Sequence, residues 1–158
     1  ISHYRNKKTD YKMSEKKRES LLWNRVKKNL TDCFLTRIES STINGIPDIH
    51  CVANGKVFWI ELKSDNISYP ALNKWQIVWI NKYIKAGGSV FIFKETLSDS
   101  SLQIYRPLSS FTDPRSVLPW LSLPHPVNWK LLQRYLLDPD GRARSRPDSR
   151  PRSRSRFK

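Results

Sequence analysis

The sequence is poor in cysteine, in long apolar runs and in acidic residues, and each shortage excludes a class of protein. Two cysteines, Cys33 and Cys51, are too few for a disulfide framework, and no CxxC pair indicates a zinc site. No stretch approaches the roughly 18 apolar residues of a membrane span, and the N-terminus lacks the apolar run of a signal peptide. We therefore expect a cytoplasmic protein that is not secreted and has no membrane partner.

The shortage of acidic residues gives the chain a large positive charge. It has 29 Lys and Arg against 14 Asp and Glu, for a net charge of +15. Residues 141–158 contribute +7 and residues 1–12 contribute +3, which leaves +5 on residues 13–140. Such an excess indicates a polyanionic partner, and nucleic acid is expected ahead of an anionic membrane surface.

The length of 158 residues allows one domain with tails. Met13 is followed at once by a helix-like segment, so residues 1–12 are predicted to be a basic extension ahead of the natural start. Residues 13–106 are predicted to form the core and residues 107–140 a helical extension. Residues 141–158 alternate Arg with Ser and Pro and are predicted to be disordered.

Within the core, apolar spacing predicts two helices and several strands. Helices are expected over 14–30 and 72–85, the second ended by Gly87-Gly88. Strands are expected in "CFLTRIES", on both sides of Asn54-Gly55, in "SVFIF" and in "SLQIY", the last at the edge of the sheet. Beyond them, "FTDPRSVLPWLSLPHP" is predicted to form short helices before an amphipathic helix over 127–137.

The Asn54-Gly55 turn fixes the register of the central hairpin. A two-residue turn pairs Ala53 with Lys56, and continuing outward it pairs Asp48 with Glu61. Alternation places Lys63 on the same face. Like charges directly opposite on a sheet destabilise it unless a cation binds between them.

A divalent cation is the expected occupant. Mg²⁺ prefers oxygen ligands and is often held by one or two carboxylates plus phosphate and water. Asp48 and Glu61 supply that pair, and the Leu62 carbonyl can add a third oxygen. Lys63 can orient an attacking water or stabilise developing negative charge.

Two helical residues extend this predicted site. Glu19 lies at the edge of the buried stripe of the first helix, either as a further metal ligand or as a solvated first-turn residue. Gln76 lies on the stripe of the second helix, either as a hydrogen-bonding orienter or as a helix-boundary residue satisfied by backbone.

These motifs resemble a known enzyme superfamily. Gly45-Ile46-Pro47-Asp48, Glu61-Leu62-Lys63, Gln76 and Gly87-Gly88, in this order, are similar to the PD-(D/E)XK nucleases, and among them to the VRR-NUC and Holliday-junction-resolvase-like group. The resemblance covers residues 14–93. It implies an α/β restriction-endonuclease-like αβββαβ core with a central mixed sheet flanked by helices, and DNA cleavage with Mg²⁺ or Mn²⁺ and no small-molecule cofactor.

The resemblance also implies residue roles. Asp48 and Glu61 would be metal ligands, Lys63 the catalytic lysine, Glu19 the acidic residue of the first helix and Gln76 the polar residue of the second. A bacterial or phage-infected cell is the implied setting, and a homodimer would suit junction cleavage.

Other residues carry weaker predictions. We expect Ser41, Thr42, Asn44 and Lys74 to contact nucleic acid, with turn formation as the alternative for the first three. His50 is expected to pack on Trp59 rather than act at the site. The aromatic residues Trp75, Trp79 and Tyr83 are expected in the core rather than stacked on bases.

The sequence thus predicts a divalent-metal-dependent DNA endonuclease, acting on structured or branched DNA. One alternative is a sequence-specific homing or restriction-type endonuclease, with base-reading elements in residues 107–137. A second is a catalytically silent nucleic-acid-binding module.

Overall fold

A mixed sheet of six strands, ordered β1 to β6 as in the chain, forms the centre of the computed structural model, in which residues 7–98 and 101–142 are described. The elements in sequence are α1 (Lys7–Asn29), β1 (Phe34–Arg37), β2 (Ile49–Ala53), β3 (Lys56–Asp65), α2 (Lys74–Lys85), β4 (Ser89–Thr96), β5 (Ser101–Tyr105), the 3₁₀ turn η1 (Pro114–Ser116), β6 (Pro119–Pro124) and α3 (Trp129–Leu137). The predicted αβββαβ order is confirmed.

The sheet is mixed because α2 connects β3 to a parallel neighbour. Strands β3 and β4 run parallel, whereas the other four neighbouring pairs are antiparallel. A parallel pair needs a crossover connection, which α2 provides. The carboxyl ends of β3 and β4 therefore lie at the same end of the sheet.

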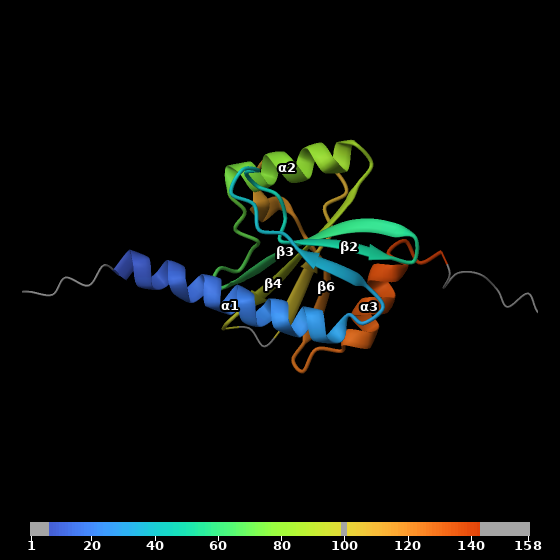
Figure 1. Ribbon diagram of the computed structural model, residues 1–158, viewed down its shortest axis with the longest axis horizontal. Helices are drawn as coiled ribbons and strands as arrows, with labels where there is room; N and C mark the ends of the chain where they lie inside the picture. Colours follow the sequence, from blue (N-terminus) through green and yellow to red (C-terminus); the bar gives the residue numbers. More distant parts are fainter. Residues whose placement is uncertain (1–6, 99–100, 143–158) are drawn as a thin grey trace, which may run out of the picture.

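Helices cover both faces of the sheet (Figure 1). On one face, α1 and α3 enclose a core of Leu22, Val26, Leu30, Leu132 and Leu136 with the inward residues of the strands. On the other face, α2 packs a second cluster that includes Ile80, Val90, Ile92 and Tyr105. In β3, even-numbered residues such as Ile60 face α1, and odd-numbered residues such as Trp59 face α2.

The hairpin register predicted from the sequence is confirmed over five residue pairs, from Ala53 with Lys56 to Ile49 with Ile60. Asn54 and Gly55 both have positive φ, as that turn requires. The sixth predicted pair is wrong, because β2 begins at Ile49 and Asp48 precedes it. Instead of lying opposite Glu61, Asp48 accepts a hydrogen bond through Oδ2 from the Leu62 N–H at 2.7 Å.

Both helix starts differ from the predicted ones. Helix α1 begins at Lys7 rather than residue 14, so part of the predicted basic extension is helical. Helix α2 begins at Lys74 rather than residue 72, because Asn73 caps it and Gln76 completes a capping box. Its predicted end is confirmed, with Gly87 at a φ of +94°.

The chain after β4 differs most from the prediction, which was an edge strand followed by short helices. Strand β5 is not an edge strand, because β6 pairs with it. The proline-punctuated segment forms η1 and β6, and only residues 129–137 are α-helical. Proline is tolerated in β6 because an edge strand leaves N–H groups unpaired.

Further expectations concern the cysteines, the membrane and the tail. Cys33 and Cys51 are free thiols. Among the described residues, no helix has the length and apolarity needed to cross a membrane. The predicted disordered tail at 141–158 lies outside the described residues from 143 onward.

Candidate active site

Asp48 is held by main-chain groups at the start of β2. Its carbonyl accepts from the Ile38 N–H at 2.8 Å, and its carboxylate accepts from the Leu62 N–H. Burial raises the pKa of Asp48, while the Leu62 N–H, Lys63 and Arg37 act to lower it. The carboxylate is therefore fixed in direction before any ligand binds.

Glu61 lies on β3 with its side chain toward α2 and is 3% exposed. The Gln76 amide donates from Nε2 to Glu61 Oε1 at 2.7 Å. The Lys63 ammonium lies 3.6 Å from the same oxygen. A buried carboxylate normally requires such partners.

Gln76 connects these groups to the first turn of α2. Its Oε1 accepts from Lys63 Nζ at 3.3 Å and from the Asn73 N–H at 2.9 Å. Since both partners of Oε1 are donors and Glu61 is an acceptor, the amide orientation is determined by its contacts. One side chain therefore both completes the helix cap and donates a hydrogen bond to Glu61.

The electrostatics of the site show a deficit of positive charge. Burial raises the pKa of Glu61 well above its ordinary value, and Asp48 and Glu19 raise it further, while Lys63 opposes them. Burial also raises the pKa of Glu19 to about 7, with Lys63 opposing and Asp48 adding. Lys63 thus acts on all three carboxyl groups, and Arg37 also acts on Asp48.

An open depression of about 510 Å³ gives access to two of these carboxyl groups. Glu19 and Asp48 line it, together with Lys16, Arg37 and residues 38–41. The predicted Ser41 is among them. Lys16 and Arg37 were missed by the sequence reasoning, although the alternation of "FLTR" indicated that Arg37 lies on a strand.

The other predicted nucleic-acid contact residues, Thr42, Asn44 and Lys74, do not line this depression. Thr42 and Asn44 are exposed, and the N–H of Thr42 donates to the Ser40 hydroxyl at 3.3 Å, as in a turn. Lys74 is exposed at the start of α2. His50 packs edge-on against Trp59, with ring centroids 4.9 Å apart.

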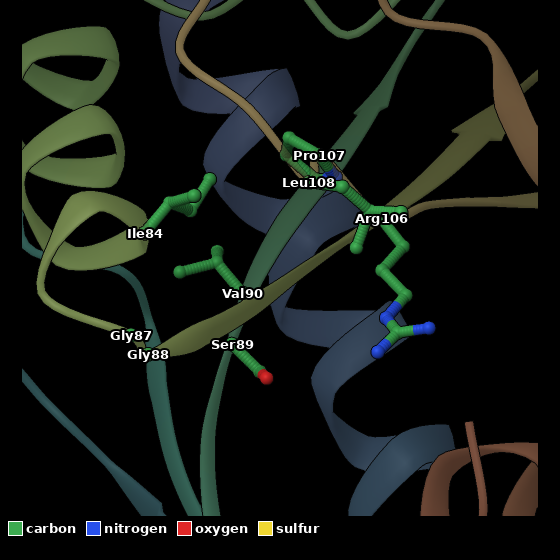
Figure 2. A pocket seen from close by; sticks show the side chains of 8 residues that line it. All are labelled: Ile84, Gly87, Gly88, Ser89, Val90, Arg106, Pro107 and Leu108. Atoms are coloured by element: carbon green, nitrogen blue, oxygen red, sulfur yellow. The ribbon is translucent and has the colours of Figure 1, made fainter. Parts of the chain in front are cut away.

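A second depression of about 240 Å³ lies at the other end of the sheet, between the end of α2 and residues 106–108. Figure 2 shows the apolar side chains of Ile84 and Val90 beside it. Arg106 also lines it, but its guanidinium is bonded to the Pro139 carbonyl and to Asp140. Glu19 and Asp48 line the first depression, whereas none of the described acidic residues lines the second.

The donor set suits a hard divalent cation that keeps much of its water. In the described part of the chain, no three His, Cys, Asp or Glu side chains are grouped closely enough to hold a metal ion. Mg²⁺ usually uses only one or two carboxylates, with water completing its shell. Asp48 and Glu61 fit that requirement, and a cation would supply the missing positive charge.

Comparisons with known proteins find similar solved structures but no sequence match. No protein-family model matches the chain, and no curated protein matches it. The fold is similar to the solved structure of Hjc from Archaeoglobus fulgidus, a Holliday junction resolvase from an archaeal hyperthermophile. That similarity has 13% identity, a TM-score of 0.46, and coverage of 73% of this chain and 92% of that one.

Proposed function

We propose that the chain is a divalent-metal-dependent endonuclease that hydrolyses phosphodiester bonds in DNA, in the manner of the PD-(D/E)XK superfamily and its VRR-NUC group. The observation that carries the proposal is the placement of two carboxylates, the half-buried Asp48 and the buried Glu61, beside Lys63 and Gln76. A protein that only bound nucleic acid would gain nothing from carboxylates that repel phosphate.

Asp48 and Glu61 would hold Mg²⁺ or Mn²⁺, with the Leu62 carbonyl as a further oxygen and Glu19 on the wall of the depression. When bound, the cation lowers the pKa of a water and neutralises phosphodiester charge. Lys63 holds its ammonium close to Glu61 and can donate to the oxyanion that develops on phosphorus. Gln76 keeps the Glu61 carboxylate oriented while that happens.

The walls of the depression support DNA as the substrate. Lys16 and Arg37 place positive charge beside Glu19 and Asp48, where a phosphate would otherwise meet only carboxylates. Ser40 and Ser41 add hydroxyl groups at the same wall. These groups would attract phosphate without reading sequence.

Residues 107–137 do not favour the sequence-specific alternative. Leu123, Leu132 and Leu136 from this segment are buried in the core on the α1 face. Strand β6 extends the sheet beside β5. The segment thus has a packing role that accounts for most of its apolar residues, although Leu108 and Leu118 are exposed.

The test is cleavage of linear, branched and single-stranded DNA by the whole chain, with Mg²⁺ or with EDTA. We expect Asp48→Asn to abolish Mg²⁺-dependent cleavage and Lys63→Met to slow it by about 10²- to 10⁴-fold. Asp113→Asn, at the partly exposed carboxylate that caps η1, is the control and should retain full activity. Cleavage that persists in EDTA or in both site variants would overturn the mechanism.

A second readout does not depend on activity. Mg²⁺ should raise the midpoint of thermal unfolding of the wild-type chain, because binding to the folded state alone stabilises it. Asp48→Asn should lose that rise. DNA binding without cleavage, and with no Mg²⁺ effect on unfolding, would favour the silent binding module instead.

A further inference from the structure

Trp75 is an exposed aromatic side chain on the first turn of α2. It is 52% exposed, which contradicts its predicted place in the core. The other two aromatic residues of the helix behave as expected, since Trp79 and Tyr83 stack on each other at 4.9 Å and pack in the α2 cluster. Trp75 is not part of either core cluster.

The backbone of Trp75 is fixed between two segments that carry the candidate site. Gln76, the next residue, bonds Glu61 and Lys63. Gly45, three residues before Asp48, packs so closely that an added Cβ would lie 2.2 Å from the Trp75 carbonyl oxygen. The indole therefore projects from a rigid position next to the site.

Trp75 lies beside one cation, on a helix that carries no acidic residue and few exposed apolar ones. Helix α2 carries Lys74, Lys82 and Lys85 and no acidic residue. The Lys74 ammonium lies 5.3 Å from the centroid of the Trp75 ring. Val78 is the only other large exposed apolar side chain of α2, which is too little for a hydrophobic protein interface.

A flat aromatic group beside an ammonium matches a base attached to a phosphate. Base–aromatic stacking tolerates any sequence because every base has a π-face. In a continuous duplex those faces are covered by neighbouring base pairs, whereas unpaired bases can be splayed out and stacked on a protein ring.

We propose that Trp75 stacks on an unpaired base of DNA, so that the protein prefers forked or frayed DNA to a continuous duplex. The inference rests on the proposed function, because that function places a DNA strand in the Glu19–Asp48 depression. From there the DNA strand would pass to the first turn of α2. Lys74 would then neutralise a phosphate beside the stacked base.

The experiment is equilibrium binding by fluorescence anisotropy in EDTA, so that cleavage does not interfere. Two labelled probes contain the same number of phosphates, one a continuous duplex and the other a forked duplex. The variants are Trp75→Phe, Trp75→Leu and Trp75→Ala, with Val78→Ala as the matched control from the same exposed face. Thermal unfolding of each variant confirms that it is folded.

We expect Trp75→Ala to weaken binding of the fork by about five- to a hundredfold and to leave duplex binding unchanged. Trp75→Phe should retain most of the fork affinity, while Trp75→Leu should resemble Trp75→Ala because it keeps apolar area but lacks a ring. Equal losses on both probes, retained fork affinity in Trp75→Leu, or no change in Trp75→Ala would each overturn the proposal.

Cleavage in Mg²⁺ separates this inference from the proposed function. Trp75-dependent fork binding by a chain that never cleaves DNA would refute the nuclease and leave the stacking role standing. Cleavage that depends on Asp48, with fork binding indifferent to Trp75, would refute the stacking role alone.

Discussion

Replacing Gly45 with alanine tests whether close backbone contact holds the Asp48 loop against α2. Gly45 has a φ of +81°, and an added Cβ would lie 2.2 Å from the Trp75 carbonyl oxygen and 2.7 Å from the Gln76 nitrogen. These are backbone atoms, so neither can rotate away as a side chain would. Either the loop or the first turn of α2 must move.

Gly55 provides the matched control, because it separates the cost of the conformation from the cost of the contact. Its φ is +70°, but an added Cβ would meet nothing within 4 Å. A residue with a Cβ pays about 1–2 kcal/mol in the left-handed region. Overpacking adds about 1–3 kcal/mol. Gly55→Ala should therefore cost about 1–2 kcal/mol and Gly45→Ala about 2–5 kcal/mol.

Urea unfolding followed by tryptophan fluorescence measures both costs. The difference between the two variants should be about 1–3 kcal/mol, without a change in the denaturant slope. At temperatures where Gly45→Ala is folded, it should also cleave DNA more slowly than Gly55→Ala, because Asp48 and Gln76 are displaced relative to each other. Equal destabilisation by the two substitutions would refute the proposed contact.

Two further predictions concern buried charge. Burial raises the pKa of Glu19 from 4.5 to about 7, so the folded chain retains a proton that the unfolded chain releases, and stability should fall as pH rises from 4.5 to about 7. Thermal unfolding across that range in EDTA should show a weaker pH dependence in Glu19→Gln, and an unchanged dependence would contradict this assignment. Lys94 is fully buried and paired with Asp65, so Lys94→Met should cost about 3–5 kcal/mol in urea unfolding because it leaves Asp65 unpaired. Adding Asp65→Asn should recover part of that loss, and a double variant less stable than Lys94→Met would show that Asp65 is satisfied by other groups.

The hairpin could be predicted from sequence because one local signal determined it. Positive φ at Asn54 and Gly55 fixes the turn, and the turn fixes the register up to Ile49 with Ile60. The predicted register fails at Asp48, where other hydrogen bonds replace the pairing between β2 and β3. The Asp48 carbonyl bonds Ile38 and its carboxylate bonds Leu62, so the chain leaves the ladder one residue earlier than extrapolation gave.

The prediction that Trp75 is buried was wrong because it assigned too wide a face of the helix to the core. An α-helix turns about 100° per residue, so Trp75 lies about 140° around the axis from the buried Ile80. Gln76 lies only about 40° from Ile80, which directs its amide toward Glu61. The angle, rather than membership of an apolar series, separates the exposed indole from the site amide.

Strand β6 and the walls of the depression could not be predicted for a different reason. The segment 119–124 begins and ends with proline, which disfavours a strand prediction, and no local turn signal indicates that it pairs with β5. Lys16 and Arg37 meet Glu19 and Asp48 only because α1 crosses beside the start of β2. Such contacts depend on how distant elements pack together, and local sequence patterns do not indicate that packing.

The sequential order of the strands has a consequence for synthesis on the ribosome. Glu19, Asp48, Glu61, Lys63 and Gln76 all precede β5, whereas Leu123, Leu132 and Leu136, which complete the core on the α1 face, come after it. Chains are made from the N-terminus, so every polar group of the site emerges before the core on the α1 face is complete. Release of β6 and α3 is then the step at which the nascent chain completes the core behind the strands that carry the site.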